Sequence, residues 1–70
     1  MDKNRLLKEC NQARSGNFFS LEIPVNSNAD GENIEQMARE LEKEGKIKIR
    51  ECMHNDTLVY VHGIVKYASN

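Results

Sequence analysis

Residues 30–49 constrain the fold of this chain more than any other stretch. Gly45 interrupts the stretch, and glycine readily takes the left-handed conformation that ends helices. Residues 46–50 then alternate basic and β-branched side chains, which is typical of a strand. The stretch therefore predicts a helix over 30–45 that leads directly into a strand. Four apolar residues before the glycine have the spacing of one helix face: Ile34, Met37, Ala38 and Leu41.

The length of the chain allows one small domain. A chain of 70 residues has no room for a second core, and a domain of this size buries only about 60% of its unfolded surface. Its stability is therefore marginal unless a disulfide, a metal or a partner chain adds to it. The pattern of helices and strands predicts a single α+β domain over residues 1–70.

Composition argues against several functional classes. The net charge is −1 at pH 7, so no overall charge draws the chain to nucleic acid or to a membrane. No apolar run approaches the length of a membrane span, and the first residues, MDKNR, contain no apolar signal region. Two cysteines are too few for a secreted disulfide framework. We therefore expect a cytoplasmic protein with no membrane partner.

Two further elements precede the central helix. Asp2 can cap a first helix over residues 3–14, so that residues 1–15 form the first unit of the fold. Apolar side chains alternate over residues 18–25, which predicts a strand, and Pro24 marks an edge or the strand's end because it has no N–H. The cap of the central helix is one of three residues, of which we favour the last two: Ser27, Asn28 and Asp30.

Residues 46–62 predict a β-hairpin. Its second strand is apolar on both sides, because Leu58 and Tyr60 lie off the face that carries the valines. Such a pattern is typical of a central strand, or of a strand with one face on a partner chain. Gly63 is a bulge or the point where the chain leaves the sheet, and residues 63–70 form a tail. The expected register pairs Ile49 with Val59 and Ile47 with Val61, with a tip at Met53, His54 and Asn55.

Residues 33–50 resemble the third helix and the first wing strand of winged-helix domains. The similarity consists of an apolar residue followed by Ala, a Leu three positions on, Glu-x-x-Gly, and then a β-branched strand. It covers about residues 30–62, and the first helix and the 18–25 strand also fall where the family places them. The family has another helix before the wing helix, where this chain has room only for a turn. The resemblance implies a winged-helix-like domain with the order helix, strand, helix, strand, strand, as in small bacterial or phage accessory regulators.

The resemblance implies contact with double-stranded DNA. Winged-helix regulators place the corresponding helix in the major groove and the wing on the DNA backbone. The helix over 30–45 is strongly acidic, however, and a duplex would repel such a surface. The first functional hypothesis is therefore a transcription regulator that touches DNA with its basic wing strand and turns the acidic helix away. The groove residues that the resemblance implies are Asn33, Gln36 and Arg39.

The wing strand suits a phosphate backbone better than the helix does. Lys46, Lys48 and Arg50 alternate with apolar residues and so share one face of the strand. Lysines on an edge strand also block the addition of further strands, and this reading is equally open.

The second functional hypothesis is a protein-interaction or dimerisation module with no nucleic-acid role. The acidic helix would engage a basic protein surface, and the apolar strand face would pair with a partner or with a second copy. The residues expected at such an interface, including that of a homodimer, are Leu58, Tyr60, Ile64 and Tyr67.

Metal binding and catalysis have little support in the sequence. The spacing of the soft ligands matches no zinc pattern with a cysteine knuckle. Cys52, His54 and Asp56 are suitable types for nucleophilic catalysis, but no pocket or oxyanion donor accompanies them. We therefore expect no metal, no cofactor and no enzymatic activity. The soft candidates are Cys10, Cys52, His54 and His62.

Overall fold

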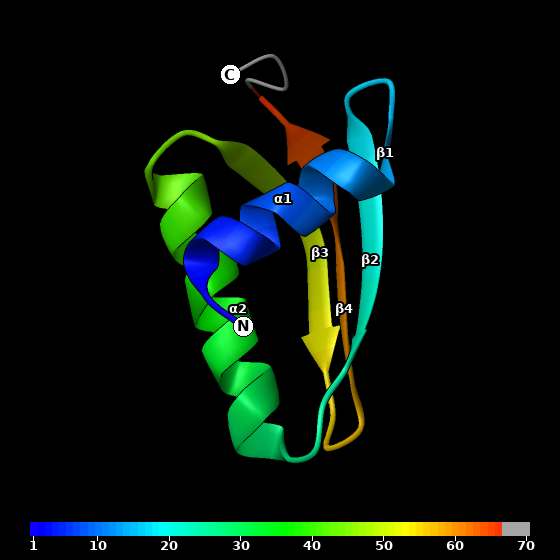
Figure 1. Ribbon diagram of the computed structural model, residues 1–70, viewed down its shortest axis with the longest axis vertical. Coiled ribbons are helices and arrows are strands. Elements are labelled where there is room, and N and C mark those ends of the chain that lie inside the picture. The colour runs from blue at the N-terminus through cyan, green and yellow to red at the C-terminus, as the bar shows by residue number, and fades with distance from the viewer. Residues whose placement is uncertain (67–70) are drawn as a thin grey trace.

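The structure is a computed structural model and describes residues 1–66 (Figure 1). The four strands form one antiparallel sheet in the order β1-β2-β4-β3, and both helices lie against the same face of it (Figure 1). The predicted α+β class and element order are confirmed, and the short strand β1 is an addition. The elements are α1 (Lys3–Ala13), β1 (Arg14–Ser15), β2 (Phe18–Pro24), α2 (Asn28–Lys43), β3 (Ile47–His54) and β4 (Leu58–Val65).

Side-chain caps begin both helices. Asp2 accepts a hydrogen bond from the backbone N–H of Arg5 at 2.8 Å, as expected. At α2 the hydroxyl of Ser27 accepts from the N–H of Asp30 at 3.2 Å. The preference for Asn28 or Asp30 as this cap was wrong, because Ser27 is the last residue with extended backbone and the helix has already begun at Asn28. Residues 25–27 join β2 to α2 with no helix between them.

The end of α2 follows the predicted glycine stop. Gly45 has a φ of 80°, in the left-handed region. Its N–H donates to the carbonyl of Glu42 at 3.0 Å, and the N–H of Lys46 donates to that of Leu41 at 3.0 Å. These hydrogen bonds satisfy carbonyl groups at the end of the helix. Strand β3 begins at Ile47, directly after this turn.

The core lies between the two helices and the face of the sheet that they cover. The predicted inner face of α2 is confirmed, with Ile34, Ala38 and Leu41 buried and Met37 partly buried against the core. The alternation predicted for β2 is confirmed as well, since Phe19 and Leu21 are buried. The other buried apolar residues are Leu6, Cys10, Ile47, Val59, Val61 and Val65.

The predicted register of the hairpin was wrong. Ile49 lies opposite Gly63 and Ile47 opposite Val65, so β4 includes residues that we expected in the tail. The turn shifts towards the C-terminus because the Asn55 side chain accepts hydrogen bonds from the N–H groups of Thr57 and Leu58, at 2.8 and 2.9 Å. The longer pairing also buries Val65 in the core.

A β-bulge in β3 separates Ile49 from Glu51 and leaves Arg50 as the extra residue. It resets the alternation of the strand, so that Cys52 and His54 face the helices, whereas the regular alternation would turn them away. Gly63 is neither a bulge nor the end of the strand, because it occupies a buried ladder position of β4 opposite this irregularity.

Candidate functional site

The helices leave one face of the sheet uncovered (Figure 1). The pairing of β2, β4 and β3 places their side chains on this face in register. We call this surface the open face. Its first row is Phe18, Ile64 and Lys48; its second row is Ser20, His62 and Glu51; its third row is Glu22, Tyr60 and Met53; and Pro24 and Leu58 complete it.

Most of the side chains on the open face are apolar or aromatic. Phe18 is 50% exposed and Met53 is 56% exposed, and apart from Met1 no other large apolar residue among residues 1–66 is as open to solvent. Between them on the central strand, Tyr60 and His62 stack with ring centroids 6.5 Å apart. Apolar side chains from three strands therefore share this face with a polar middle row, and such a mixed surface is typical of protein interfaces.

The open face carries charges of both signs at its two sides. Lys48 and Glu51 lie on β3, and Glu22 lies on β2 with β4 in between. Within residues 1–66 none of these three charges forms an ion pair. They are therefore available to a group that approaches the face from outside.

The structure brings together three of the four residues expected at a protein interface. Leu58, Tyr60 and Ile64 alternate along β4 and are half-buried on the open face, whereas Tyr67 lies outside the described residues. Sequence reasoning missed Phe18 and Met53 as members of this surface. The two-residue period of β2 could have found Phe18, but Met53 depends on the bulge, which no pattern in the sequence indicated.

The residues expected to contact nucleic acid do not share one surface. Lys48 lies on the open face, whereas Gln36 and Arg39 lie on α2, on the opposite side of the sheet (Figure 1). Lys46 pairs with Glu44 at 3.4 Å. Arg39 also forms an ion pair within the chain, and the bulge residue Arg50 is exposed at the edge of the sheet.

Much of the acidic surface of α2 is neutralised within the chain. Lys3 of α1 contacts Glu44 and lies 3.7 Å from Glu40. The hydrogen bond with Lys3 lowers the pKa of Glu44, and the same contact raises the pKa of Lys3. Glu42 accepts a hydrogen bond from the backbone N–H of Ile49 at 2.9 Å, on the edge strand β3. These carboxylates hold α1 and β3 in place, which weakens the case that they recruit a basic partner.

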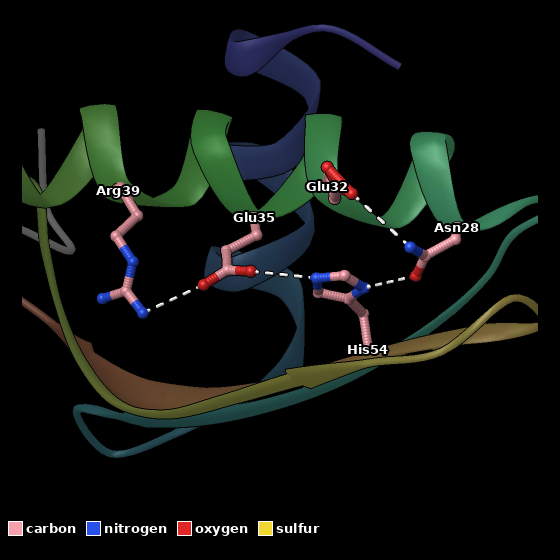
Figure 2. Close-up of polar contacts among 5 residues, drawn as sticks. All are labelled: Asn28, Glu32, Glu35, Arg39 and His54. Carbon is pink, nitrogen blue, oxygen red and sulfur yellow. Dashed lines mark hydrogen bonds and ion pairs between the residues drawn. The ribbon is translucent and has the colours of Figure 1, made fainter.

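A polar network joins α2 to the end of β3 (Figure 2). The Nε2 atom of His54 lies 3.1 Å from a carboxylate oxygen of Glu35, and its Nδ1 atom lies 3.2 Å from the Asn28 side-chain oxygen. Arg39 donates to the other Glu35 oxygen at 3.0 Å. The His54 ring can approach the helix because a Cβ at Gly31 would lie only 3.1 Å from it. Since each ring nitrogen faces an oxygen of α2, His54 links the end of β3 to two positions on that helix.

The soft side chains considered as metal ligands in the sequence do not converge. His62 faces away from the helices, whereas Cys52 and His54 face towards them. Within the described part of the chain, no group of three or more His, Cys, Asp or Glu side chains is placed to hold a metal ion. Burial raises the pKa of the Cys10 thiol to about 12 and also raises that of Cys52, so neither thiol is an activated nucleophile.

Comparisons with known proteins identify no relative. No family model, no curated protein and no solved structure matches the chain. The resemblance to winged-helix domains therefore stays a prediction. No helix within residues 1–66 is both long enough and apolar enough to cross a membrane.

Proposed function

We propose that the protein is a small interaction module that associates with a second copy of itself through the open face. One observation carries the proposal: apolar side chains from three strands lie side by side on a face that neither helix covers. The exposed positions, Phe18 and Met53, flank the half-buried residues of β4. Removing this surface from water would contribute about 25 cal/mol per Å² of apolar area.

The small size of the chain supports the same proposal. The two helices cover one face of the antiparallel sheet and leave the other face open to water or to a partner. A second copy packed on the open face would cover it, and a domain of 70 residues gains most from such help.

Self-association agrees with the geometry better than nucleic-acid binding does. The cations expected to contact DNA are divided between opposite sides of the sheet, and Lys46 and Arg39 are engaged in ion pairs. DNA affinity depends on several cations that reach the phosphates together. A titration with duplex DNA at low salt is therefore expected to leave the backbone amide signals of residues 46–50 unmoved. Shifts confined to these residues would instead favour a nucleic-acid function.

Sedimentation equilibrium tests the proposal directly. The wild-type chain is expected to form dimers, and the double variant Phe18→Ser/Met53→Ser is expected to stay monomeric. Both side chains are at least half exposed, so the substitutions leave the core intact, and circular dichroism checks that the fold is retained. Gln36→Ser, on the exposed side of α2, is the matched control and should associate like the wild type. A monomeric wild-type chain at every concentration would refute the proposal.

A further inference from the structure

Two opposite charges and two apolar side chains occupy the corners of the open face. Lys48 lies beside Ile64 at one corner, and Glu22 lies beside Tyr60 at the diagonally opposite corner. Phe18 and Met53 occupy the two remaining corners. Neighbouring strands are about 4.8 Å apart and alternate residues on a strand are about 6.8 Å apart. The part of the open face between the four corner residues therefore measures roughly 10 by 14 Å. A second copy can pack on the open face in parallel or crossed orientations.

A symmetric dimer that packs face to face has its two-fold axis in the plane between the sheets. With the axis along the strands, Lys48 lies over Phe18 of the second copy, and Glu22 lies over Met53. With the axis across the strands, Lys48 lies over Met53 and Glu22 over Phe18. Both arrangements bury a charge against an apolar side chain, which costs free energy without any compensating contact.

The two diagonal axes make the strands of the copies cross at roughly 70°, closer to orthogonal than to aligned sheet packing. An axis through the Lys48 and Glu22 corners stacks each charge on its own equivalent, so like charges repel. An axis through the Phe18 and Met53 corners places Lys48 over Glu22 of the second copy, and this occurs twice by symmetry. It also places each of the two exposed apolar side chains on its equivalent.

We infer that two copies associate in this crossed arrangement, with Lys48 of each copy paired to Glu22 of the other. The inference rests on the proposed function and adds the orientation and the residues that select the partner. The pair fixes the crossing direction because the other symmetric arrangements leave Lys48 and Glu22 without an opposite charge across the interface. The crossed arrangement leaves only Glu51 without one, over Tyr60 of the second copy. The open face is much smaller than the roughly 800 Å² that each partner buries in a standard interface, so we expect weak association, with a dissociation constant of about 100 μM.

Charge reversal tests the inference. In Lys48→Glu alone, both intermolecular pairs become acidic, and in Glu22→Lys alone both become basic. Each variant is expected to lose at least about tenfold in self-association at low ionic strength. An equimolar mixture of the two variants restores both pairs in the mixed dimer, and its affinity is expected to return to within about threefold of the wild type. Lys8→Glu makes the same charge change on the exposed side of α1 and serves as the control.

The outcomes separate this inference from the proposed function. If Phe18→Ser/Met53→Ser abolishes association but the mixture of charge variants gains nothing over each variant alone, the crossed arrangement is wrong and self-association through the open face stands. If the serine double variant associates as the wild type does, both the crossed arrangement and self-association through the open face are wrong. Preferential mixed dimers, detected by sedimentation with one variant fluorescently labelled, would establish the Lys48–Glu22 pair.

Discussion

Gly63 of β4 packs against the backbone of Lys48 in β3, where no side chain can be accommodated. A Cβ on Gly63 would overlap the Lys48 carbonyl oxygen and lie 3.1 Å from its carbonyl carbon. This contact lies beside the bulge that follows Ile49. The bulge turns His54 towards α2 and Met53 towards the open face. The close contact at Gly63 in β4 therefore lies where the side chains of β3 change direction.

We expect Gly63→Ala to destabilise the fold by about 3 kcal/mol, because the clash is with backbone that cannot rotate away. Urea unfolding followed by circular dichroism measures the change. Gly16→Ala is the control: its Cβ would meet nothing within 4 Å, and only the positive φ of 63° opposes it, so its cost should be about 1 kcal/mol. Equal effects at the two sites would show that the Gly63 contact is not tight.

The contact between His54 and Glu35 is expected to stabilise the fold because it joins β3 to α2. A double-mutant cycle with His54→Ala and Glu35→Ala, measured by urea unfolding, should give a coupling free energy of about 1 kcal/mol. A coupling free energy near zero would mean that the contact contributes nothing to stability.

The buried thiol of Cys10 should make stability fall at alkaline pH. Burial raises its pKa from 9.0 to about 12 in the folded chain. The unfolded chain releases this proton first, so the contribution is complete below pH 9 and is lost as the pH rises towards 12. The stability of wild type relative to Cys10→Ala should therefore be constant below pH 9 and decline above it. A constant difference throughout would contradict the raised pKa.

Removing the cap of α2 should cost stability. Ser27→Ala loses the hydroxyl that accepts from the Asp30 N–H, and we expect a loss of about 1 kcal/mol in thermal or urea unfolding. Gln36→Ala, on the exposed side of the same helix, should change stability by less than about 0.5 kcal/mol. If the free energy of unfolding falls equally in the two variants, the Ser27 cap makes no specific contribution to stability.

Local patterns in the sequence were sufficient for most of the fold. The face of α2, the stop at Gly45 and the alternation along β2 each follow from a period or a residue type within a few positions. The apolar character of β4 on both sides left two interpretations open, and the position of β4 inside the sheet confirms the central strand. These features could be predicted because each depends on neighbours in sequence.

Features that depend on distant contacts could not be predicted. The hairpin register depends on Gly63 facing Ile49 and on the turn formed by Asn55, and one extra residue in β3 exchanges its two faces. The sequence therefore gave no sign that Met53 joins the open face or that His54 meets Glu35. The acidic residues of α2 suggested a partner surface, whereas several of them bind groups elsewhere in the same chain.

Self-association through the open face is the central claim, and an isotope-filtered NMR experiment tests it most directly. In a mixture of labelled and unlabelled chains at about 1 mM, above the expected dissociation constant, we expect intermolecular NOEs that link Phe18, Tyr60 and Ile64 of one copy to the open face of the other. Intermolecular NOEs confined to α2, or none at all, would contradict the claim.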